Sequence, residues 1–311
     1  MEQWIPEDER IRQDSYISNM SLPPPAPDQA YCTISALEAG RIDMDLDQLI
    51  DIASPGERVD LPDLIFLLRH SRTDAKFLFD LGVRPDPENL PSGAKHVIDT
   101  MGLKLVGQPD LRAALALGGL TPEDIAHVCL SHIHFDHTGE PALFPRATFL
   151  LGADAEPAIA AHAPDFAGTI YAVDVPRART EFLRTDGWPP LGPFAHALDF
   201  YGDGSVYVVD AAGHVPGHLN LLVRTSGDGG WLYLAADSAH DWRIIDGQAG
   251  FAHNPKVGCI HKDPAQAVRH VECIRELRRD PRVRVLLTHD IPWYEKNKGG
   301  PAFWPGSIES L

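Results

Sequence analysis

Short apolar runs recur along the chain at the length of β-strands. The runs Leu61–Leu68 and Ala75–Leu81 are nearly continuous, which is typical of strands buried on both faces. The same pattern predicts further strands at Tyr31–Leu37, Ala126–Leu130, Ala147–Leu151, Val206–Val209, Leu219–Val223, Trp231–Ala235 and Val283–Leu287. Strands are therefore expected in both halves of the chain.

Helix signals lie between these runs. Helical stretches are predicted at Asp110–Leu117 and Asp154–His162, and residues 121–124 (TPED) form a helix-start signal. Because a mixed strand-and-helix half occurs twice, the sequence predicts two α/β layers packed face to face.

A longer helix is predicted to begin at Asp263. This residue is a suitable N-cap, and Pro264 and Gln266 follow as the first helical residue and the capping-box partner. Apolar residues at helical spacing are expected to pack inward, namely Val268, Val271, Ile274 and Leu277.

Residues 1–30 are predicted to form an arm ahead of one domain that spans residues 31–311. Four prolines between positions 23 and 27 favour an extended, polyproline-type linker. We expect a loosely packed surface extension, with an arm that serves oligomerisation as the alternative.

The charge balance excludes some functions. The 311 residues include 27 Lys and Arg against 44 Asp and Glu, a net charge of −17. Phosphate contacts and anionic membranes both require basic surfaces, so neither nucleic acid nor a membrane is an expected partner. The N-terminus lacks a signal-peptide pattern, and the four cysteines form no CxxC pair. A cytoplasmic location is therefore expected.

Four metal-ligand side chains follow one predicted strand within six positions: His132, His134, Asp136 and His137. In an extended segment, residues two apart point the same way, so His132 and His134 can share one ion. The turn that follows lets Asp136 and His137 face a second ion. Imidazole and carboxylate suit Zn²⁺ or a similar cation. Three further candidates follow other predicted strands, namely His214, Asp237 and His289.

This order of motifs resembles the metallo-β-lactamase superfamily. HIHFDHTG, AGHVPGHLN and THDI are most similar to its N-acyl-homoserine lactonase branch. The resemblance implies an αββα sandwich of two mixed β-sheets flanked by helices, with a hydrolase domain over residues 31–311. It implies two zinc ions, the first held by His132, His134 and His214. Asp136, His137 and His289 would hold the second, and Asp237 would bridge the two.

Two histidines need separate treatment. His218, the second histidine of AGHVPGH, is expected to be a turn or supporting residue. His240 stands three residues after Asp237, where the lactonase branch has a tyrosine. A histidine can also donate a hydrogen bond to a carbonyl oxygen or an oxyanion, so His240 is a candidate catalytic and substrate-binding residue. The alternative is a bystander that faces solvent.

The resulting hypothesis is ester hydrolysis that opens a lactone ring, with an acyl-homoserine lactone as one candidate substrate. Two cations can share a water, lower its pKa and generate a hydroxide nucleophile. Asp136 would protonate the leaving alkoxide. Candidate substrate contacts are Phe135, Trp293 and Tyr294. The sequence leaves open whether the chain forms a homodimer.

Rival functions differ in what they require. A glyoxalase-II-like thioesterase shares the ligand order but requires a basic pocket for glutathione, and the segment GGPAFWPGSIESL offers no Lys or Arg. A mononuclear iron dioxygenase can keep the HxHxDH string and is distinguished by its metal content. The net charge of −17 disfavours nuclease activity. The lack of a Gly-x-Ser-x-Gly elbow disfavours serine catalysis. A non-catalytic binding protein would not need all seven ligands.

Overall fold

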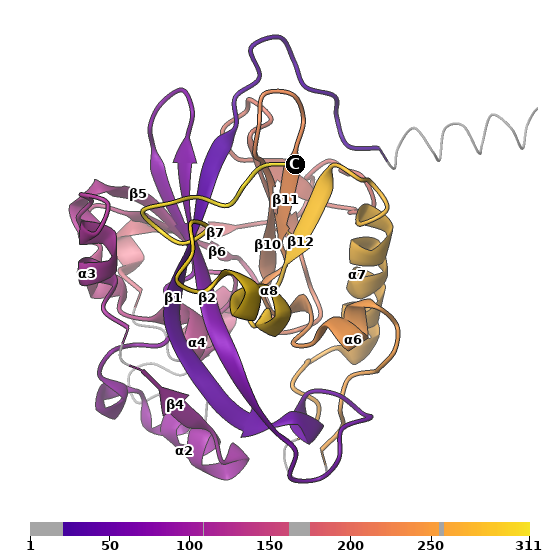
Figure 1. The fold of residues 1–311 in the computed structure, drawn as a ribbon. Coiled ribbons are helices and arrows are strands. Elements are labelled where there is room, and N and C mark those ends of the chain that lie inside the picture. Colours follow the sequence, from indigo (N-terminus) through magenta and orange to yellow (C-terminus); the bar gives the residue numbers. More distant parts are fainter. Residues whose placement is uncertain (1–20, 108, 162–174, 255–257) are drawn as a thin grey trace, which may run out of the picture.

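The computed structural model describes residues 21–107, 109–161, 175–254 and 258–311. Two β-sheets face each other, and the flanking helices lie on their outer sides (Figure 1). This arrangement confirms the predicted αββα sandwich.

The first sheet has seven strands in the order β4-β1-β2-β3-β5-β6-β7. Neighbours from β4 to β3 pair antiparallel, and those from β3 to β7 pair parallel. The strand bounds are β1 Cys32–Asp45, β2 Arg58–His70, β3 Lys76–Phe79, β4 Lys104–Val106, β5 Ile125–Cys129, β6 Thr148–Gly152 and β7 Thr180–Leu183.

The second sheet has five strands in the order β12-β11-β10-β9-β8. Its strands pair antiparallel except for β11 and β12, which are parallel, so both sheets are mixed. The strand bounds are β8 Ala197–Asp199, β9 Val206–Asp210, β10 Leu219–Arg224, β11 Trp231–Leu234 and β12 Val283–Leu286.

Helices and short 3-10 turns connect the strands. The α-helices are α2 Ser92–Met101, α3 Leu111–Ala116, α4 Phe135–Thr138, α5 Ala155–Ala161, α6 Trp242–Ile245, α7 Pro264–Leu277 and α8 Ile291–Asn297. The 3-10 turns are Leu46–Gln48, Pro87–Asn89, Pro122–Asp124, Pro141–Leu143, Arg177–Arg179 and Ala236–Ser238. Within the described ranges, no helix combines the length and the apolar character that crossing a bilayer would require.

The continuous apolar run of β2 follows from burial on both faces. Leu64 and Phe66 lie in the core between the sheets, together with Leu221 of β10. Ile65 and Leu67 point the other way, into the outer core of the first sheet. Successive side chains of a strand alternate between faces, so both positions of the repeat must be apolar here.

Helix α7 begins as predicted, because the Asp263 side chain accepts a hydrogen bond from the Gln266 backbone N–H at 2.9 Å. Its inward face differs in one position: Val271, Ile274 and Leu277 are buried, whereas Val268 is 45% exposed. A spacing of three residues drifts by about 60° per step on a helix of 3.6 residues per turn. Val268 has therefore rotated away from the buried face.

Several predicted boundaries change. The helix-start signal at Thr121 opens only the 3-10 turn Pro122–Asp124, which leads directly into β5. The helix predicted at Asp154–His162 is α5, and position 162 lies outside the described residues. The pattern missed β4, β7 and β8, because such short strands carry no long apolar run.

The described end of the arm is fastened to the domain. Leu22 is buried in the core, and the backbone oxygen of Pro23 accepts a hydrogen bond from the Arg224 guanidinium at 3.1 Å. The Gln29 amide donates to the backbone oxygen of Asp203 at 2.8 Å. Leu22, Gln29 and Ala30 are therefore packed against the domain, whereas Pro24 and residues 26–28 are exposed, as expected for a surface extension. Residues 1–20 lie outside the described part of the chain.

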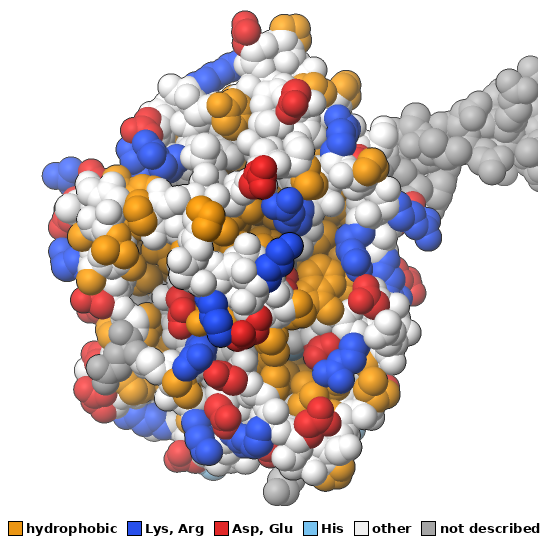
Figure 2. Space-filling view, viewed as in Figure 1, with side chains coloured by type: hydrophobic (Ala, Val, Ile, Leu, Met, Phe, Trp, Pro, Cys, Tyr) orange, Lys and Arg blue, Asp and Glu red, His pale blue; other side chains and the backbone are white. Residues whose placement is uncertain are grey.

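The surface mixes charges of both signs. Figure 2 shows Lys and Arg side chains interspersed with Asp and Glu over the face that it draws. Many acidic groups form local ion pairs, such as Arg58 with Asp45 at 2.9 Å and Arg278 with Asp246 at 2.8 Å. The net charge of −17 is thus not concentrated in one block on this face.

Candidate metal centre

The carboxyl ends of strands from both sheets meet at one edge of the sandwich. His132 and His134 lie in the loop between β5 and α4, and Asp136 and His137 belong to α4 itself. From the second sheet, the β9–β10 turn supplies His214, and the residues that follow β11 and β12 supply Asp237 and His289. All seven predicted ligands are therefore brought together.

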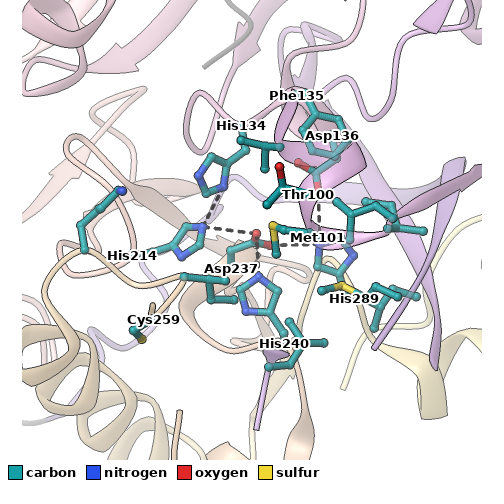
Figure 3. Close-up of a pocket in the computed structure, with 18 of the residues that line it drawn as sticks. Thr100, Met101, His134, Phe135, Asp136, His214, Asp237, His240, Cys259 and His289 are labelled. Atoms are coloured by element: carbon teal, nitrogen blue, oxygen red, sulfur yellow. Dashed lines mark hydrogen bonds and ion pairs between the residues drawn. The ribbon is translucent and has the colours of Figure 1, made fainter. Parts of the chain in front are cut away.

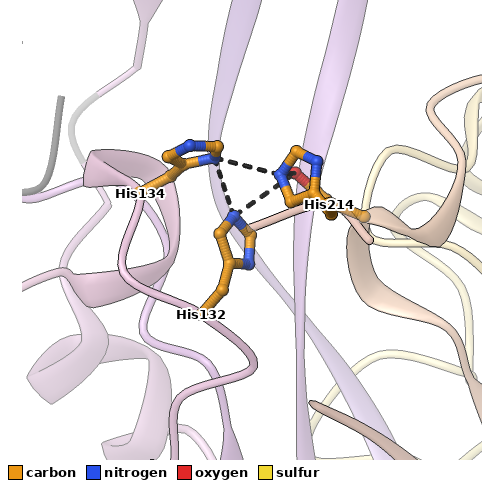
Figure 4. A group of neighbouring side chains, drawn as sticks. His132, His134 and His214 are labelled. Atoms are coloured by element: carbon orange, nitrogen blue, oxygen red, sulfur yellow. Dashed lines mark hydrogen bonds and ion pairs between the residues drawn. The ribbon is translucent and has the colours of Figure 1, made fainter. Parts of the chain in front are cut away.

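Three imidazoles form the first group, His132, His134 and His214. The Nε2 atom of His132 lies 2.9 Å from Nδ1 of His134, which lies 3.1 Å from Nε2 of His214. Figure 4 shows these ring nitrogens turned toward one another. Two ligands of a tetrahedral zinc ion at about 2.1 Å lie roughly 3.4 Å apart, so this spacing is close to that of a zinc site.

Asp136, His137 and His289 form the second group. Nε2 of His289 lies 3.7 Å from Oδ2 of Asp136, and Nε2 of His137 lies 3.9 Å from the same oxygen. All three side chains are buried. Their ligand atoms lie within 4.8 Å of one another, so they could also hold an ion.

Asp237 lies between the two groups. Its Oδ2 atom is 3.5 Å from Nε2 of His214 in the first group and 3.3 Å from Nε2 of His137 in the second. Its Oδ1 atom is 3.5 Å from Nε2 of His289. The carboxylate is 1% exposed, so its charge acts on both groups with little screening by water.

The protonation of these groups follows from burial and from Asp237. Burial lowers the pKa of His134 to about 3 and that of His214 well below its ordinary value, so both imidazoles are neutral and offer lone pairs. Burial also opposes the charged form of His289, but the carboxylates of Asp237 and Asp136 outweigh it and raise its pKa to about 9. A bound cation would replace that proton as the partner of the carboxylates.

Hydrogen bonds to backbone oxygens hold two histidines of this region, one of them a candidate ligand. Nδ1 of His289 donates to the backbone oxygen of Pro62 at 2.8 Å, and Nδ1 of His218 donates to that of Ala211 at 2.9 Å. The buried ring of His218 packs 5.3 Å from that of His132, centroid to centroid. This placement agrees with the expected supporting role of His218.

The sequence reasoning missed Asp80, which follows β3. One of its oxygens lies 2.8 Å from Nδ1 of His137, and its carboxylate also accepts bonds from the backbone N–H and hydroxyl of Ser131, at 2.6 and 2.7 Å. Such carboxylates fix the orientation of a metal-binding histidine. The signal was available: Asp80 stands near the end of the apolar run Ala75–Leu81, much as the candidate ligand Asp237 follows the apolar run Trp231–Ala235.

Asp80→Asn is expected to weaken zinc binding by about 10- to 100-fold, the usual cost of losing an outer partner of a ligand. Asparagine keeps the shape and tolerates the positive φ of 66° at this position. Competition with a chelator measures the affinity. Asp110→Asn is the matched control, because Asp110 caps α3 and asparagine caps equally well. An Asp80→Asn protein that binds zinc like its parent contradicts this supporting role.

His240 lies beside both Asp237 and the second group. Its Nε2 atom is 3.0 Å from Oδ2 of Asp237, and its ring stacks on that of His289 with centroids 5.5 Å apart. Together with Asp237 and His289 it forms a third set of donors that could hold an ion. Its side chain is 7% exposed, so His240 is not a residue that faces bulk solvent.

A cavity of about 290 Å³ opens onto these groups (Figure 3). Five of the candidate ligands and His240 line it, namely His134, Asp136, His214, Asp237, His240 and His289. The rest of the lining is largely apolar. It comes mainly from β1, β2, α2 and the residues just after α2, and includes Ile42, Met44, Leu61, Val97, Met101 and Leu103. The site therefore combines polar candidate ligands with an apolar chamber.

Of the three predicted substrate contacts besides His240, one lines the cavity. Phe135 lines the cavity, whereas Trp293 and Tyr294 are not among its lining residues. Tyr294 is buried in the core between the sheets, where its hydroxyl donates to the Glu38 carboxylate at 2.7 Å, and the half-buried Trp293 packs against the same core. The rings of both residues lie near that of Phe303. Residues of α2 and its flanks occupy the wall instead.

Sequence comparison gives relatives for most of the chain. The profile of the Metallo-beta-lactamase superfamily matches residues 60–235. Gamma-lactamase MBL2 of Gibberella moniliformis is 34% identical over 52% of this chain and 70% of its own length. N-acyl homoserine lactonase AttM of Azorhizobium caulinodans is 32% identical over 60% of this chain and 66% of its own. Cytochrome P450 monooxygenase mpaDE' of Penicillium brevicompactum is 29% identical over 96% of this chain, which spans only 38% of that protein.

Solved structures share the fold. An N-acyl homoserine lactone hydrolase with N-hexanoyl-L-homoserine at its metal centre superposes with a TM-score of 0.67 at 18% identity, over 89% of this chain and 99% of the other. AidC, a dizinc quorum-quenching lactonase, superposes with a TM-score of 0.57 at 16% identity, over 83% of this chain and 87% of the other.

Proposed function

The chain belongs to the metallo-beta-lactamase superfamily, and we propose that it is a dinuclear zinc hydrolase that opens a lactone ring. The observation that carries this proposal is the position of Asp237. Its carboxylate lies within 3.6 Å of ring nitrogens of both ligand groups, which suits one carboxylate shared by two cations.

The donor set fits two zinc ions. The first group offers neutral imidazoles together with the Asp237 carboxylate, and the second offers two imidazoles, from which a cation would displace the proton, together with the Asp136 carboxylate. Nε2 of His137 and Oδ1 of Asp237 are buried and accept or donate no hydrogen bond among the described residues, as expected for atoms reserved for a metal.

A pair of divalent cations would supply a Lewis acid for the substrate carbonyl and a water of lowered pKa as nucleophile. The chain's own residues then hold the substrate and move protons. Asp136 lines the cavity beside His289, and we assign it the proton that the leaving alkoxide takes up. His240 also lines the cavity, where its Nε2–H can turn from Asp237 to the developing oxyanion.

The cavity suits a lactone with an apolar substituent. Its side walls are aliphatic, and Phe135 adds an aromatic ring next to Asp136. Lys262 is the single Lys or Arg among the lining residues. An acyl-homoserine lactone meets this description, and so does an aromatic lactone. A glutathione thioester, which carries two carboxylates, has few basic partners here, so thioesterase activity is the weaker candidate.

A γ-lactam is a second candidate substrate. The observation that favours it is the 34% identity to gamma-lactamase MBL2, together with 29% identity to gamma-lactamase FDB1 of Fusarium pseudograminearum over 61% of this chain. The same groups would serve an amide bond, because Asp136 could protonate a leaving nitrogen as well as a leaving oxygen.

Zinc-loaded protein is expected to hydrolyse at least one lactone in a panel of acyl-homoserine lactones, aryl lactones, γ-lactams and thioesters. The metal-stripped protein is the control for every compound. Turnover of thioesters alone favours the thioesterase. Absence of zinc-dependent turnover of every lactone and lactam contradicts the proposal.

The metal content is expected to be two zinc ions per chain, since the seven ligands form two groups. Elemental analysis of protein produced with adequate zinc measures it. A value that stays near one after zinc supplementation contradicts the dinuclear site. One iron per chain together with oxygen consumption identifies the dioxygenase instead.

A further inference from the structure

Asp63 is a buried acidic residue of β2 to which neither the ligand motifs nor the proposed mechanism assigns a task. Its side chain has no exposed surface, and neither carboxyl oxygen has a hydrogen-bond partner among the described residues. A carboxylate in such a place is costly unless another charge compensates it. Asp63 is the one charged residue in the otherwise apolar run LPDLIFLL, which covers residues 61–68.

The backbone on both sides of Asp63 is tied to the segment that carries His289. The backbone oxygen of Pro62 accepts from Nδ1 of His289 at 2.8 Å, and the backbone N–H of Leu64 donates to the oxygen of Thr288 at 3.1 Å. Alternation along the strand puts Asp63 on the face of Leu61, which lines the cavity, and of Ile65, whose core cluster also contains Ile133 of the ligand loop. Asp63 thus lies in the strand segment that supports His289 of the second ligand group.

The charges around Asp63 are those of that group. Burial raises the pKa of Asp63 well above its ordinary value, positive charge on His137 and His289 lowers it, and the carboxylates of Asp136 and Asp80 raise it further. The charge of the carboxyl is therefore coupled to both histidines of the second group. With Asp136 and Asp237, it would be a third acidic group around an ion bound there.

We propose that Asp63 is a positioning residue of the second metal site, where its carboxylate holds the ion bound by Asp136, His137 and His289 by charge without contacting it. A divalent cation would compensate the otherwise unpaired carboxylate, and the carboxylate would in return strengthen retention of that cation, as linkage requires. This inference rests on the dinuclear site proposed above.

The test compares Asp63→Asn and Asp63→Val with the parent full-length protein. Both variants remove the charge, and they differ in shape and polarity. Chelator competition measures the two zinc-binding steps separately, and thermal unfolding of the metal-free proteins gives their Tm. In both variants, one zinc step is expected to weaken by about 10-fold or more while the other stays unchanged. The metal-free Tm is expected not to fall, because an unpaired buried acid has been removed.

Asp203→Asn is the matched control. The Asp203 carboxylate pairs with His70 of β2. His70 lies seven residues beyond Asp63, or about 23 Å along the strand. The Asp203→Asn substitution is expected to leave both zinc-binding steps unchanged.

The outcomes separate this inference from the dinuclear proposal. A parent that binds two ions, with variants that bind both as tightly, overturns the role of Asp63 alone. Variants in which both steps weaken equally and the metal-free Tm falls show a packing role and also overturn it. A parent that binds a single ion overturns both proposals, because no second ion is then present for Asp63 to hold.

Discussion

Asp237→Asn is expected to lose one of the two zinc ions and most of the hydrolytic activity, on the order of 10³-fold in kcat, or roughly 4 kcal/mol. Asparagine keeps the shape but not the charge. In the structure this one carboxylate lies 3.0–3.6 Å from ring nitrogens of both ligand groups and of His240. Without it, two cations at close range would repel each other with no carboxylate between the two groups to offset the repulsion.

Elemental analysis and steady-state kinetics on the same preparation measure this effect. Asp263→Asn is the matched control, since Asp263 caps α7 through its side chain and asparagine is an equally good cap. If Asp237→Asn keeps both ions and the parent rate, Asp237 does not bridge the two groups.

His240→Ala is expected to lower kcat by about 10²-fold, or roughly 3 kcal/mol, which is the usual cost of losing one oxyanion donor. The zinc content is expected to stay the same, because each group keeps its own ligands. The structure supports a donor role, since His240 lines the cavity beside Asp237 and its side chain is only 7% exposed.

The zinc content decides between two functions of His240, because this residue also belongs to a set of donors that could hold an ion. A kcat within about twofold of the parent refutes the donor role. Loss of an ion in His240→Ala shows that the residue is a ligand rather than a donor. His253→Ala, which removes an exposed histidine outside the cavity lining, is the control.

The convergence of the seven candidate ligands could be predicted because its signals are local. His132, His134, Asp136 and His137 form one motif, and the remaining ligands each follow an apolar run. Strand ends of such a fold meet at one edge, so residues in these positions converge without knowledge of the loops. The two-layer architecture was predicted for the same reason, since alternating apolar runs and helix signals are also local.

The cavity walls could not be predicted, because they come from segments that carry no motif. Ile42 and Met44 belong to β1, and Val97 and Met101 to α2, a helix that the pattern did not indicate. Nearness in sequence was also misleading. Tyr294 lies five residues after His289, but α8 directs its hydroxyl to Glu38, away from the ligands.

The division between the metal-binding edge and the chamber has an evolutionary consequence. The ligands come from residues 132–137 and 214–289, whereas most of the apolar wall comes from residues 42–103, which contain no ligand. Substitutions in the wall can alter which ring is admitted without disturbing the groups that break the bond. Relatives of the proposed hydrolase are therefore expected to differ in substrate through aliphatic side chains of β1 and α2, while the candidate ligands stay in place.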